Sequence, residues 1–353
     1  MDTVRIHIAV EPAYDVMIGD GLLSVCGELL TDVIKPCKAA VITDTNVGPL
    51  YLAAVKESLT GAGFQVSTYE FPAGEQNKRM STLASVLEFL AEEKLTRSDI
   101  VVALGGGVVG DLAGFAAGCY LRGIRFVQLP TTLLAAVDSS VGGKTAVDLS
   151  AGKNLAGLFW QPSMVICDTG VLKKLPDSIL AEGAAEAIKT GMLAGEKLFA
   201  LCEDGIRENL TEIVIGCVRH KGSVVEQDER ETGLRKTLNL GHTPAHAIEL
   251  LSGFGVSHGN AVAMGLAQMS LAAEKLGNGD KEIAARVVSA LEAAGLPTKT
   301  QYTPDEMAKA AFADKKRSGG SITIALPVGI GNCELRTISM DELEAVFAAG
   351  TGA

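Results

Sequence analysis

The sequence has neither an excess of basic residues nor paired cysteines, and each absence excludes a class of protein. Lys and Arg number 31 against 42 Asp and Glu, so the net charge is −11 at pH 7. General nucleic-acid binding needs a basic surface, so we expect no nucleic-acid partner. The seven cysteines form no Cys-x-x-Cys pair, and the N-terminus has no signal-peptide pattern. This usage predicts reduced thiols in a cytoplasmic protein.

Long uninterrupted apolar runs are also missing, although 47% of the residues are apolar. The longest such stretch, 101–121, approaches the length of a membrane span, but it contains Asp111 and six glycines. A buried strand, a glycine turn and a helix fit it better, so we expect no membrane association. The chain has 353 residues, a length that suits two domains.

The order of apolar patterns predicts what these two domains are. Short apolar runs alternate with helical patterns up to residue 175, which predicts a Rossmann-like α/β domain with a parallel sheet. Its expected strands are 39–43, 65–71, 100–104, 125–129 and 163–167, with an amphipathic helix at 82–93. Helical periodicity then dominates, at 178–194, 212–228, 243–251, 260–276, 281–294 and 340–349, with strand-like residues at 321–326 and after Gly331. We therefore expect an α/β domain over residues 1–175 and a mainly α-helical domain over residues 176–353.

A glycine-rich turn, Gly105 to Asp111, lies between a predicted strand and a predicted helix. Glycine lets the backbone approach a diphosphate, and a helix N-terminus offers free N–H groups and a favourable dipole. The turn is therefore either a dinucleotide phosphate site or a tight strand-to-helix connection. Asp44 ends an earlier predicted strand, where it can accept hydrogen bonds from an adenosine ribose or cap a helix.

Histidine is scarce, with five residues in the chain, yet three of them fall between 242 and 258. His242 and His246 are four residues apart, on one face of a helix, and His258 follows in a polar turn. Imidazoles with a carboxylate form the ligand set of a catalytic zinc site, although a single histidine is more often a capping or core residue. The carboxylate candidate is Glu186, in a helix of small residues that also contains Lys189. A buried charge there needs a partner or a metal, or the two residues form an ion pair.

Basic residues beside glycine, small or turn residues are candidates for an anion pocket inside an acidic protein. Alone, each is more typical of a solvated surface charge. The segment 142–145, Gly-Gly-Lys-Thr, is only weakly similar to a phosphate-binding P-loop. These basic residues are Arg122, Lys144, Lys153, Lys189, Lys221 and Arg235.

Several longer motifs are more specific than any of these features. They are residues 128–145 (QLPTTLLAAVDSSVGGKT), Gly152-Lys153-Asn154, the helix 185–189 (AEAIK), 228–231 (DERE), 239–242 (NLGH) with His246, His258-Gly259, and 314–316 (DKK). In this order they resemble the 3-dehydroquinate synthase family, over about residues 14–330. The resemblance implies an N-terminal NAD domain, a helical C-terminal domain, an active site in the cleft between them, and a homodimer. It also implies NAD and a divalent metal, zinc or cobalt, as cofactors.

The resemblance assigns a role to individual residues. The implied metal ligands are Glu186, His242 and His258. The implied NAD contacts are Asp44, Thr45, Asn46, Glu75, Lys78, Gly107, Val108, Val109, Gly110, Asp111, Thr131, Thr132, Lys153 and, in a less close match, Val171, Leu172, Lys173 and Lys174. The implied substrate contacts are Arg122, Asp138, Lys144, Asn154, Lys189, Lys221, Arg235, Asn239 and one of Lys315 or Lys316. The implied catalytic residues are His246, Glu231, Lys144 and Asp138, with His246 and Glu231 as the candidate general bases.

The implied reaction starts from 3-deoxy-D-arabino-heptulosonate 7-phosphate. Transient oxidation by NAD⁺ at C5 acidifies the neighbouring C–H, phosphate leaves by elimination, the hydride returns, and an intramolecular aldol step closes the carbocycle. No net redox occurs, so the enzyme is a lyase. The alternatives are another sugar-phosphate cyclase, a glycerol-dehydrogenase-like oxidoreductase, and a non-catalytic NAD-binding protein. The chain departs from the family pattern at Asn260, at Pro244-Ala245 and at Asp148-Leu149.

Overall fold

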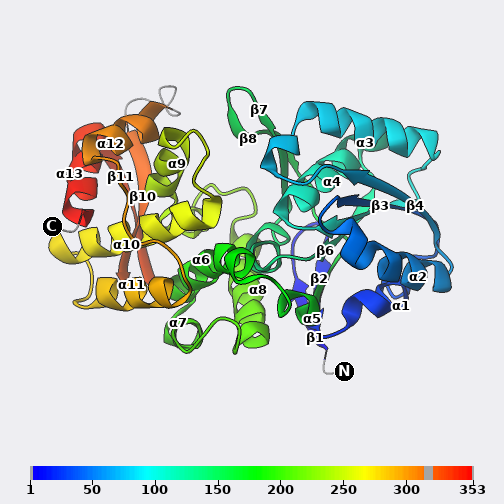
Figure 1. The fold of residues 1–353 in the computed structure, drawn as a ribbon, viewed down its shortest axis with the longest axis horizontal. Helices are drawn as coiled ribbons and strands as arrows, with labels where there is room; N and C mark the ends of the chain where they lie inside the picture. Colours follow the sequence, from blue (N-terminus) through cyan, green and yellow to red (C-terminus); the bar gives the residue numbers. More distant parts are fainter. Residues whose placement is uncertain (1–2, 314–320, 352–353) are drawn as a thin grey trace. The chain divides into compact units, whose positions relative to one another are not determined.

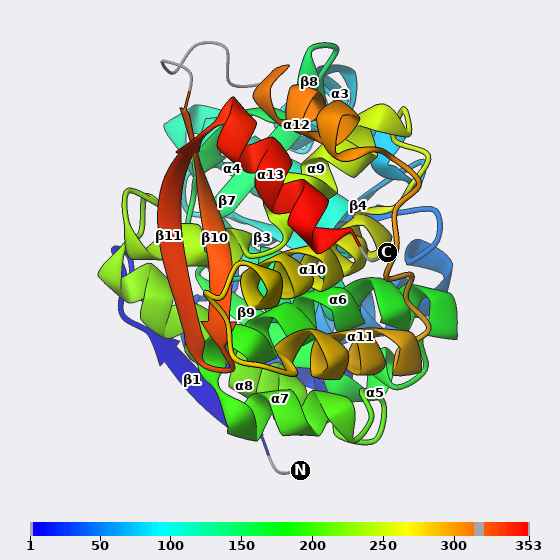
Figure 2. The same cartoon turned by 90° about the vertical axis from the view of Figure 1, so that its left-hand side faces the viewer.

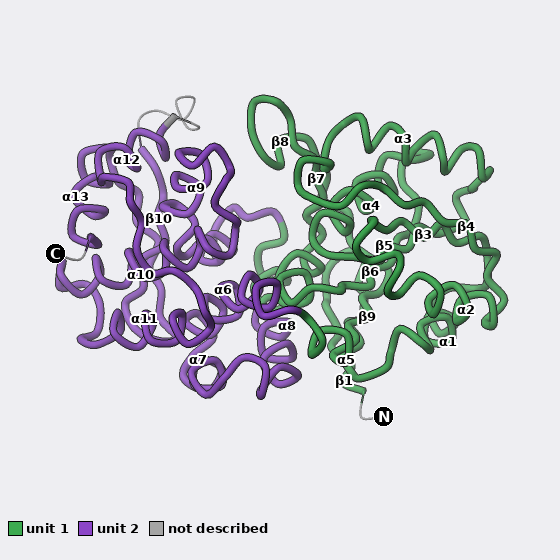
Figure 3. Tube along the Cα trace, in the orientation of Figure 1, with its two compact units in different colours: residues 1–175, 221–229 green, residues 176–220, 230–353 purple. Residues whose placement is uncertain are grey.

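The computed structural model describes residues 3–313 and 321–351, and the chain folds as two compact units (Figure 3). Unit 1 comprises residues 1–175 and 221–229, and unit 2 comprises residues 176–220 and 230–353. Helix α8 (Leu210–Gln227) therefore begins in unit 2 and ends in unit 1. A single boundary at residue 175 does not describe this arrangement, because Lys221–Glu229 belongs with the N-terminal unit.

Seven strands of the described residues form the central sheet of unit 1, in the order β1-β2-β9-β6-β5-β3-β4. Strand β1 runs antiparallel to β2, and every other neighbouring pair is parallel. The strands are β1 (Val4–Ile8), β2 (Tyr14–Gly19), β3 (Lys38–Asp44), β4 (Gln65–Phe71), β5 (Ile100–Gly105), β6 (Arg125–Pro130) and β9 (Met164–Asp168). The predicted α/β fold with a parallel sheet is confirmed.

Helices cover both faces of this sheet (Figure 1), which explains why its inner strands are apolar on both sides. All six residues of β5 are buried. Helices α1 (Cys26–Thr31) and α2 (Ala53–Gly61) pack on one face, and α3 (Met80–Glu92) and α4 (Gly107–Cys119) pack on the other. A short helix, α5 (Thr169–Leu172), follows β9.

A separate antiparallel hairpin, β7 (Lys144–Leu149) and β8 (Gly152–Phe159), completes unit 1. Its first strand begins directly after Gly142 and Gly143, both of which have a positive φ. The Gly-Gly-Lys-Thr segment thus enters a strand, whereas a P-loop enters a helix. The weak likeness to a P-loop has no structural counterpart.

Unit 2 is mainly helical, as predicted, with one β-hairpin. Its helices are α6 (Asp177–Ala194), α7 (Glu196–Glu203), the first part of α8, α9 (His242–Leu251), α10 (His258–Lys275), α11 (Ile283–Ala293), α12 (Pro304–Ala313) and α13 (Met340–Gly350). The hairpin, β10 (Ser321–Gly329) with β11 (Asn332–Ser339), packs against α10 (Figure 2). Within the described ranges, no helix combines the length and the apolar character needed to cross a membrane.

Glycines let the three central helices of unit 2 approach one another closely. A Cβ added to Gly265 on α10 would lie 2.1 Å from the carbonyl oxygen of Gly241, which caps the N-terminus of α9. A Cβ added to Gly259 would lie 2.5 Å from the carbonyl oxygen of Glu182 on α6. His242 and His258, the first residues of α9 and α10, are next in sequence to Gly241 and Gly259. The close packing at these glycines therefore brings both side chains near α6.

Candidate active site

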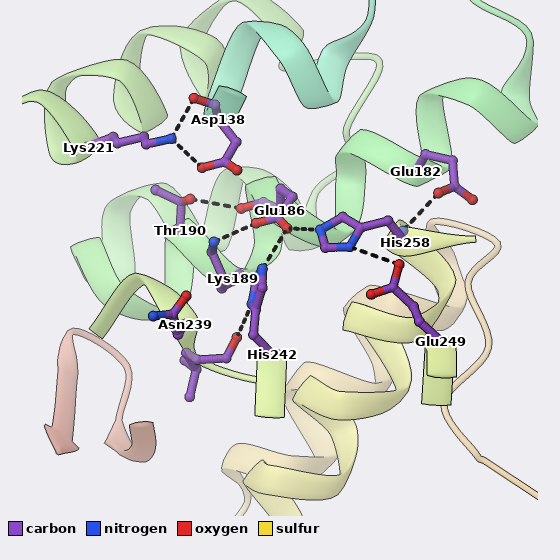
Figure 4. Close-up of polar contacts among 12 residues, drawn as sticks. Asp138, Glu182, Glu186, Lys189, Thr190, Lys221, Asn239, His242, Glu249 and His258 are labelled. Atoms are coloured by element: carbon purple, nitrogen blue, oxygen red, sulfur yellow. Dashed lines mark hydrogen bonds and ion pairs between the residues drawn. The ribbon is translucent and has the colours of Figure 1, made fainter. Parts of the chain in front are cut away.

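Three helices of unit 2 bring a carboxylate and two imidazoles together (Figure 4). Glu186 comes from the middle of α6, His242 is the first residue of α9, and His258 is the first residue of α10. Within the described residues, one ligand atom from each forms a group whose members all lie within 4.8 Å of one another. The residues that the resemblance implies as metal ligands are thus neighbours in space.

The carboxylate of Glu186 is fully buried, because α6 is built from small and apolar residues that pack on every side. Its Oε2 lies 2.5 Å from Nζ of Lys189, which is 2% exposed, so the two residues also form the i, i+3 ion pair that was the alternative interpretation. Burial alone would raise the pKa of Glu186, but Lys189 and the two imidazoles hold it well below its usual value. The second oxygen, Oε1, faces the imidazoles.

Both imidazoles present the same nitrogen to Glu186. Nε2 of His242 lies 3.4 Å and Nε2 of His258 lies 3.1 Å from Oε1 of Glu186. Two ligands of a tetrahedral zinc ion, each about 2.0–2.1 Å from the metal, are themselves separated by roughly 3.3 Å. The donor types and their spacing therefore fit a zinc or cobalt ion held by three protein ligands, with a coordination position left for substrate.

The other nitrogen of each ring faces an oxygen atom. Nδ1 of His242 lies 3.1 Å from the carbonyl oxygen of Leu240, and Nδ1 of His258 lies 3.6 Å from Oε1 of Glu249. Metal-bound histidines in proteins are usually oriented in this way. Glu249 is seven residues after His242 on the same helix, a spacing that places both on one face. That spacing is the only local signal that could have indicated Glu249, which the sequence analysis missed.

Glu182, which was not predicted either, anchors the N-terminus of α10. Its carboxylate accepts hydrogen bonds from the Ser257 hydroxyl and from the backbone N–H of Gly259, the latter at 2.8 Å. Glu182 and Glu186 are four residues apart on α6, so one helix face contacts both the cap of α10 and its first side chain. The position of His258 is therefore fixed by its own helix as well as by its ring contacts.

The remaining predicted residues of unit 2 come from α9, from the segment that precedes it, and from residues outside the described ranges. His246 is exposed on that helix, with its ring centroid 5.6 Å from that of His242. Glu231 accepts a 2.6 Å hydrogen bond from the side chain of Asn239. Arg235 is 2% exposed, in the 3-10 helix Leu234–Asn239. Lys315 and Lys316, one of which the resemblance assigns to the substrate, lie outside the described residues.

In unit 1 the predicted NAD residues gather at the carboxyl edge of the sheet. The connections after the neighbouring strands β3 and β5 lead to helices on opposite faces, α2 and α4. A parallel sheet binds ligands at such a switch point, outside the carboxyl ends of its strands. Asp44 ends β3, and Gly107 begins α4 just after β5. The turn of 105–111 is therefore a strand-to-helix connection located where a dinucleotide would bind.

The glycines of this turn divide into two groups. A Cβ on Gly105 would lie 2.4 Å from Val109, and one on Gly110 would lie 2.6 Å from Oε1 of Gln128, so both are required by packing inside the unit. Gly106 and Gly107 have more space, with nearest atoms at 3.1 and 3.2 Å. These two carry the first backbone N–H groups of α4, which have no acceptor within the helix and can bind a phosphate.

Other predicted NAD residues have structural contacts of their own. Oδ1 of Asp44 accepts 2.9 Å hydrogen bonds from the backbone N–H groups of Asn46 and Val47, so Asp44 does cap a turn. Thr45 accepts a hydrogen bond from the N–H of Ala73, and Thr132 accepts one from the N–H of Ala135.

Two further segments with predicted NAD residues follow β6 and β9. The Thr131 hydroxyl, after β6, is buried with no hydrogen-bond partner in the described part of the chain. Val171 and Leu172 are buried and Lys173 and Lys174 are exposed, so the side chains of the first two fill the core.

Lys78 is the centre of a buried polar network in unit 1. Its Nζ lies 2.6 Å from Oδ1 of Asn154, 3.0 Å from Asp111 and 3.4 Å from Glu75. Burial lowers the pKa of Lys78, but the two acids raise it above its usual value. The backbone N–H of Asn154 donates to Asp148 at 2.8 Å. A predicted substrate residue is thereby held at both its side chain and its backbone.

The predicted basic residues of unit 1 differ in exposure. Nζ of Lys221 is buried and lies 2.6 Å from Oδ1 of Asp138 and 2.5 Å from its carbonyl oxygen. Arg122 and Lys144 are exposed, and Lys153 is half-buried. Burial therefore distinguishes Lys221 from the other three side chains.

Three predicted residues have a left-handed backbone, which is costly for any residue other than glycine. The φ angles are +69° at Arg122, +55° at Asn154 and +60° at Glu231. Such backbone strain is often retained at functional sites, where the surrounding structure enforces it. The same conformation occurs at Lys94, Leu121, Phe254 and Glu282, so it is not confined to predicted site residues.

Comparison with known proteins decides the family. A family model for the N-terminal part of 3-dehydroquinate synthases matches residues 68–182, and one for the C-terminal part matches residues 183–317. The 3-dehydroquinate synthase of Streptococcus pneumoniae is 42% identical over 349 residues, which covers 97% of this chain and 98% of that protein. The chain belongs to the 3-dehydroquinate synthase family. The resemblance seen in its motifs is confirmed.

Solved structures of related cyclases share the fold of this family member. A 2-deoxy-scyllo-inosose synthase complexed with carbaglucose-6-phosphate, NAD⁺ and Co²⁺ matches with a TM-score of 0.86 and 26% identity, covering 99% of this chain and all of that one. A 2-epi-5-epi-valiolone synthase from Streptomyces hygroscopicus, with NAD⁺ and Zn²⁺ bound, matches with a TM-score of 0.85 and 27% identity, covering 96% of each chain.

The departures from the 3-dehydroquinate synthase pattern are compatible with the local structure. Pro244 lies in the first turn of α9, where a missing N–H removes no helical hydrogen bond. Asp148, near the end of β7, accepts the N–H of Asn154 on β8. Asn260 is a half-buried residue in the first turn of α10. None of these substitutions replaces a residue of the three-ligand group.

Proposed function

We propose that this chain is an enzyme that converts 3-deoxy-D-arabino-heptulosonate 7-phosphate to 3-dehydroquinate and phosphate, a step of the shikimate pathway to aromatic amino acids. Membership of the 3-dehydroquinate synthase family supports the overall reaction. The single observation that carries the chemistry is the group of Glu186, His242 and His258, whose donor atoms have the spacing of a zinc ligand set.

Glu186, His242 and His258 would hold the divalent metal, and the first turn of α4, from Gly107, would hold the diphosphate of NAD. When bound, the metal supplies a Lewis acid and NAD a reversible hydride acceptor. Buried Lys189 keeps Oε2 of Glu186 occupied, so that Oε1 is directed to the imidazoles. Oδ1 of Asp44 accepts hydrogen bonds within its turn, so Asp44 would bind the adenosine ribose mainly through Oδ2.

The substrate carries a phosphate and a carboxylate, and basic and amide side chains would orient both groups. Lys144, Lys221 and Arg235 supply positive charge, and Asn154 is fixed by Lys78 and Asp148. Lys221 is itself held by Asp138, which keeps its ammonium group in one place. Basic side chains of this kind can bind an anionic substrate even in a protein of net charge −11.

His246 and Glu231 would handle protons. Exposed His246 is adjacent to His242, so a proton acceptor lies next to a proposed metal ligand. Glu231 is oriented by its hydrogen bond from Asn239. Both side chains have the chemistry of a general base that works near neutral pH or above.

The proposal also includes a cytoplasmic homodimer. The seven cysteines all lie in the described part of the chain, and all are free thiols, which agrees with a reducing compartment. Gel filtration with light scattering would test the dimer.

The deciding experiment uses purified full-length protein loaded with zinc or cobalt, the heptulosonate phosphate and NAD⁺. We expect one phosphate and one 3-dehydroquinate per substrate consumed, with no net NADH. Absence of phosphate release would overturn the proposal. Formation of an inosose or a valiolone from other sugar phosphates would indicate another cyclase, and NADH accumulation with a polyol would indicate a glycerol-dehydrogenase-like enzyme.

A further inference from the structure

A second buried carboxylate lies behind the candidate metal centre. Glu249 on α9 is 3% exposed, and its Oε1 lies 3.6 Å from Nδ1 of His258. Figure 4 shows His258 between two carboxylates, with Glu186 on its Nε2 side and Glu249 on its Nδ1 side. A buried carboxylate requires a positive or hydrogen-donating neighbour. The imidazole of His258 is one such neighbour.

We propose that Glu249 is a positioning residue that selects the metal-binding tautomer of His258, an inference that rests on the proposed function in taking His258 as a metal ligand. An ionised carboxylate 3.6 Å away attracts a ring N–H and repels a ring lone pair, so it favours the tautomer of neutral His258 whose proton is on Nδ1. The lone pair is then on Nε2, which faces Oε1 of Glu186. The other tautomer would direct an N–H group at the metal and could not bind it.

His242 shows the same arrangement with a neutral acceptor. Its Nδ1 lies 3.1 Å from the carbonyl oxygen of Leu240, so its tautomer is fixed by the backbone. Glu249 adds a negative charge that Leu240 does not. Because Glu249 lies on the Nδ1 side of the ring, this charge acts on the metal through His258, by making that imidazole a stronger ligand. Loss of the charge should therefore weaken metal binding by the same route as loss of the ring orientation.

A purely structural role for Glu249 is the competing explanation, since the same contact joins α9 to α10. The two explanations differ in whether the effect of Glu249 requires the imidazole of His258. A positioning residue acts through that imidazole and has no effect on the metal once the imidazole is absent. A structural contact affects the fold of both helices whether or not His258 is present.

The test measures zinc affinity of metal-stripped, full-length protein by competition with a chromophoric chelator. Glu249→Gln should weaken zinc binding by about 10- to 100-fold, because its amide can donate as well as accept and carries no charge. The absorption spectrum of the cobalt-loaded variant should also change, because the ligand field reports the orientation of His258. Glu249→Asp keeps the charge, so its zinc affinity should lie between that of Glu249→Gln and that of the original protein. Glu344→Gln removes one negative charge from an exposed residue of α13 and should leave the zinc affinity unchanged.

A double-mutant cycle separates positioning from structure. In the His258→Ala background, Glu249→Gln should cause no further loss of zinc affinity; an equal loss there would overturn the inference. Unchanged affinity in folded Glu249→Gln protein would overturn it as well. Should that variant not fold, Glu249→Asp decides, and an unaltered affinity with an unaltered cobalt spectrum would refute the positioning role. Substrate is absent from these assays, so failure of the proposed reaction leaves their result readable.

Discussion

His258 lies between two buried carboxylates, Glu186 and Glu249. Burial lowers its pKa, but the hydrogen bonds and charges of Glu186 and Glu249 outweigh that effect and raise it from 6.5 to about 10. In the metal-free protein the ring is therefore an imidazolium at neutral pH, and a metal ion must displace its proton. The same two carboxylates that stabilise the proton are the groups that would stabilise the metal.

The raised pKa gives the metal-free protein a pH-dependent stability. A histidine whose pKa is higher in the folded state contributes stability that is complete below its unfolded pKa, near 6.5, and is lost as the pH rises toward about 10. We expect the free energy of unfolding to fall across this window, by at most about 1.4 kcal/mol per pH unit. Thermal melting of chelator-treated protein at pH 6 to 10 measures it.

A matched variant isolates the contribution of His258. His258→Gln keeps a polar side chain that cannot titrate, so its melting temperature should change less over the same pH range. Equal slopes for the two proteins would show that the imidazole is not responsible. Saturating zinc should also flatten the slope, since the bound ion replaces the proton.

Single residues of the site were predictable to different degrees. Scarce histidines at 242, 246 and 258, and a lone Glu186 among small residues, indicated a metal site from chemistry alone. The choice among the three histidines came from the family motifs, because spacing cannot tell which ring turns inward. Glu249 was missed because its role depends on the approach of α10 to α9, which residues remote in sequence determine.

The close packing of helices α9 and α10 is a property of elements rather than of one side chain. Gly265→Ala would place a methyl group 2.1 Å from the carbonyl oxygen of Gly241, so the helices must separate. Overpacking of this kind costs roughly 1–3 kcal/mol of stability. Because the helices carry His258 and His242, zinc affinity should fall as well. Chemical denaturation and the chelator competition assay measure the two effects.

A control for the helix propensity of alanine is available at Gly61, the last residue of α2. A Cβ there meets nothing within 4 Å, and its φ is not left-handed. Gly61→Ala should leave stability unchanged or raise it by up to about 1 kcal/mol, with zinc affinity unaltered. Destabilisation by both substitutions alike would argue against the packing explanation for Gly265.

Elements were predicted well where apolar patterning was strong. The expected strand 65–71 coincides with β4, and the strand 100–104 lies within β5, whose residues are all buried. The hairpin β7–β8 was not predicted, because β8 exposes most of its residues and contains glycines at both 152 and 157. Strand β2 and the edge strand β1 were also missed, although the sequence of β1, Val-Arg-Ile-His-Ile, alternates as a half-buried strand does.

For the molecule as a whole, the cysteine distribution gives a testable statement about redox state. Cys119 is exposed, and burial raises the pKa of Cys26 to about 11 and that of Cys202 to about 12. A disulfide reagent added to native protein should therefore modify Cys119 first, because thiolate is the reactive form. In denaturant without reductant all seven thiols should react. Fewer than seven would reveal a disulfide and contradict a protein of a reducing compartment.

The chain passes between its two units at residues 175, 220 and 229, and this has a consequence for recombination. Residues 221–229 pack with partners far earlier in the sequence: Gly222 against Ile8, Glu226 with the N–H of Ala9, and Glu229 with Gln161. In a chimera joined at residue 175, residues 1–175 would come from one parent and residues 221–229, which pack against them, would come from the other. Exchange of the nucleotide-binding half between relatives, in nature or by design, must therefore transfer two separate pieces of the gene.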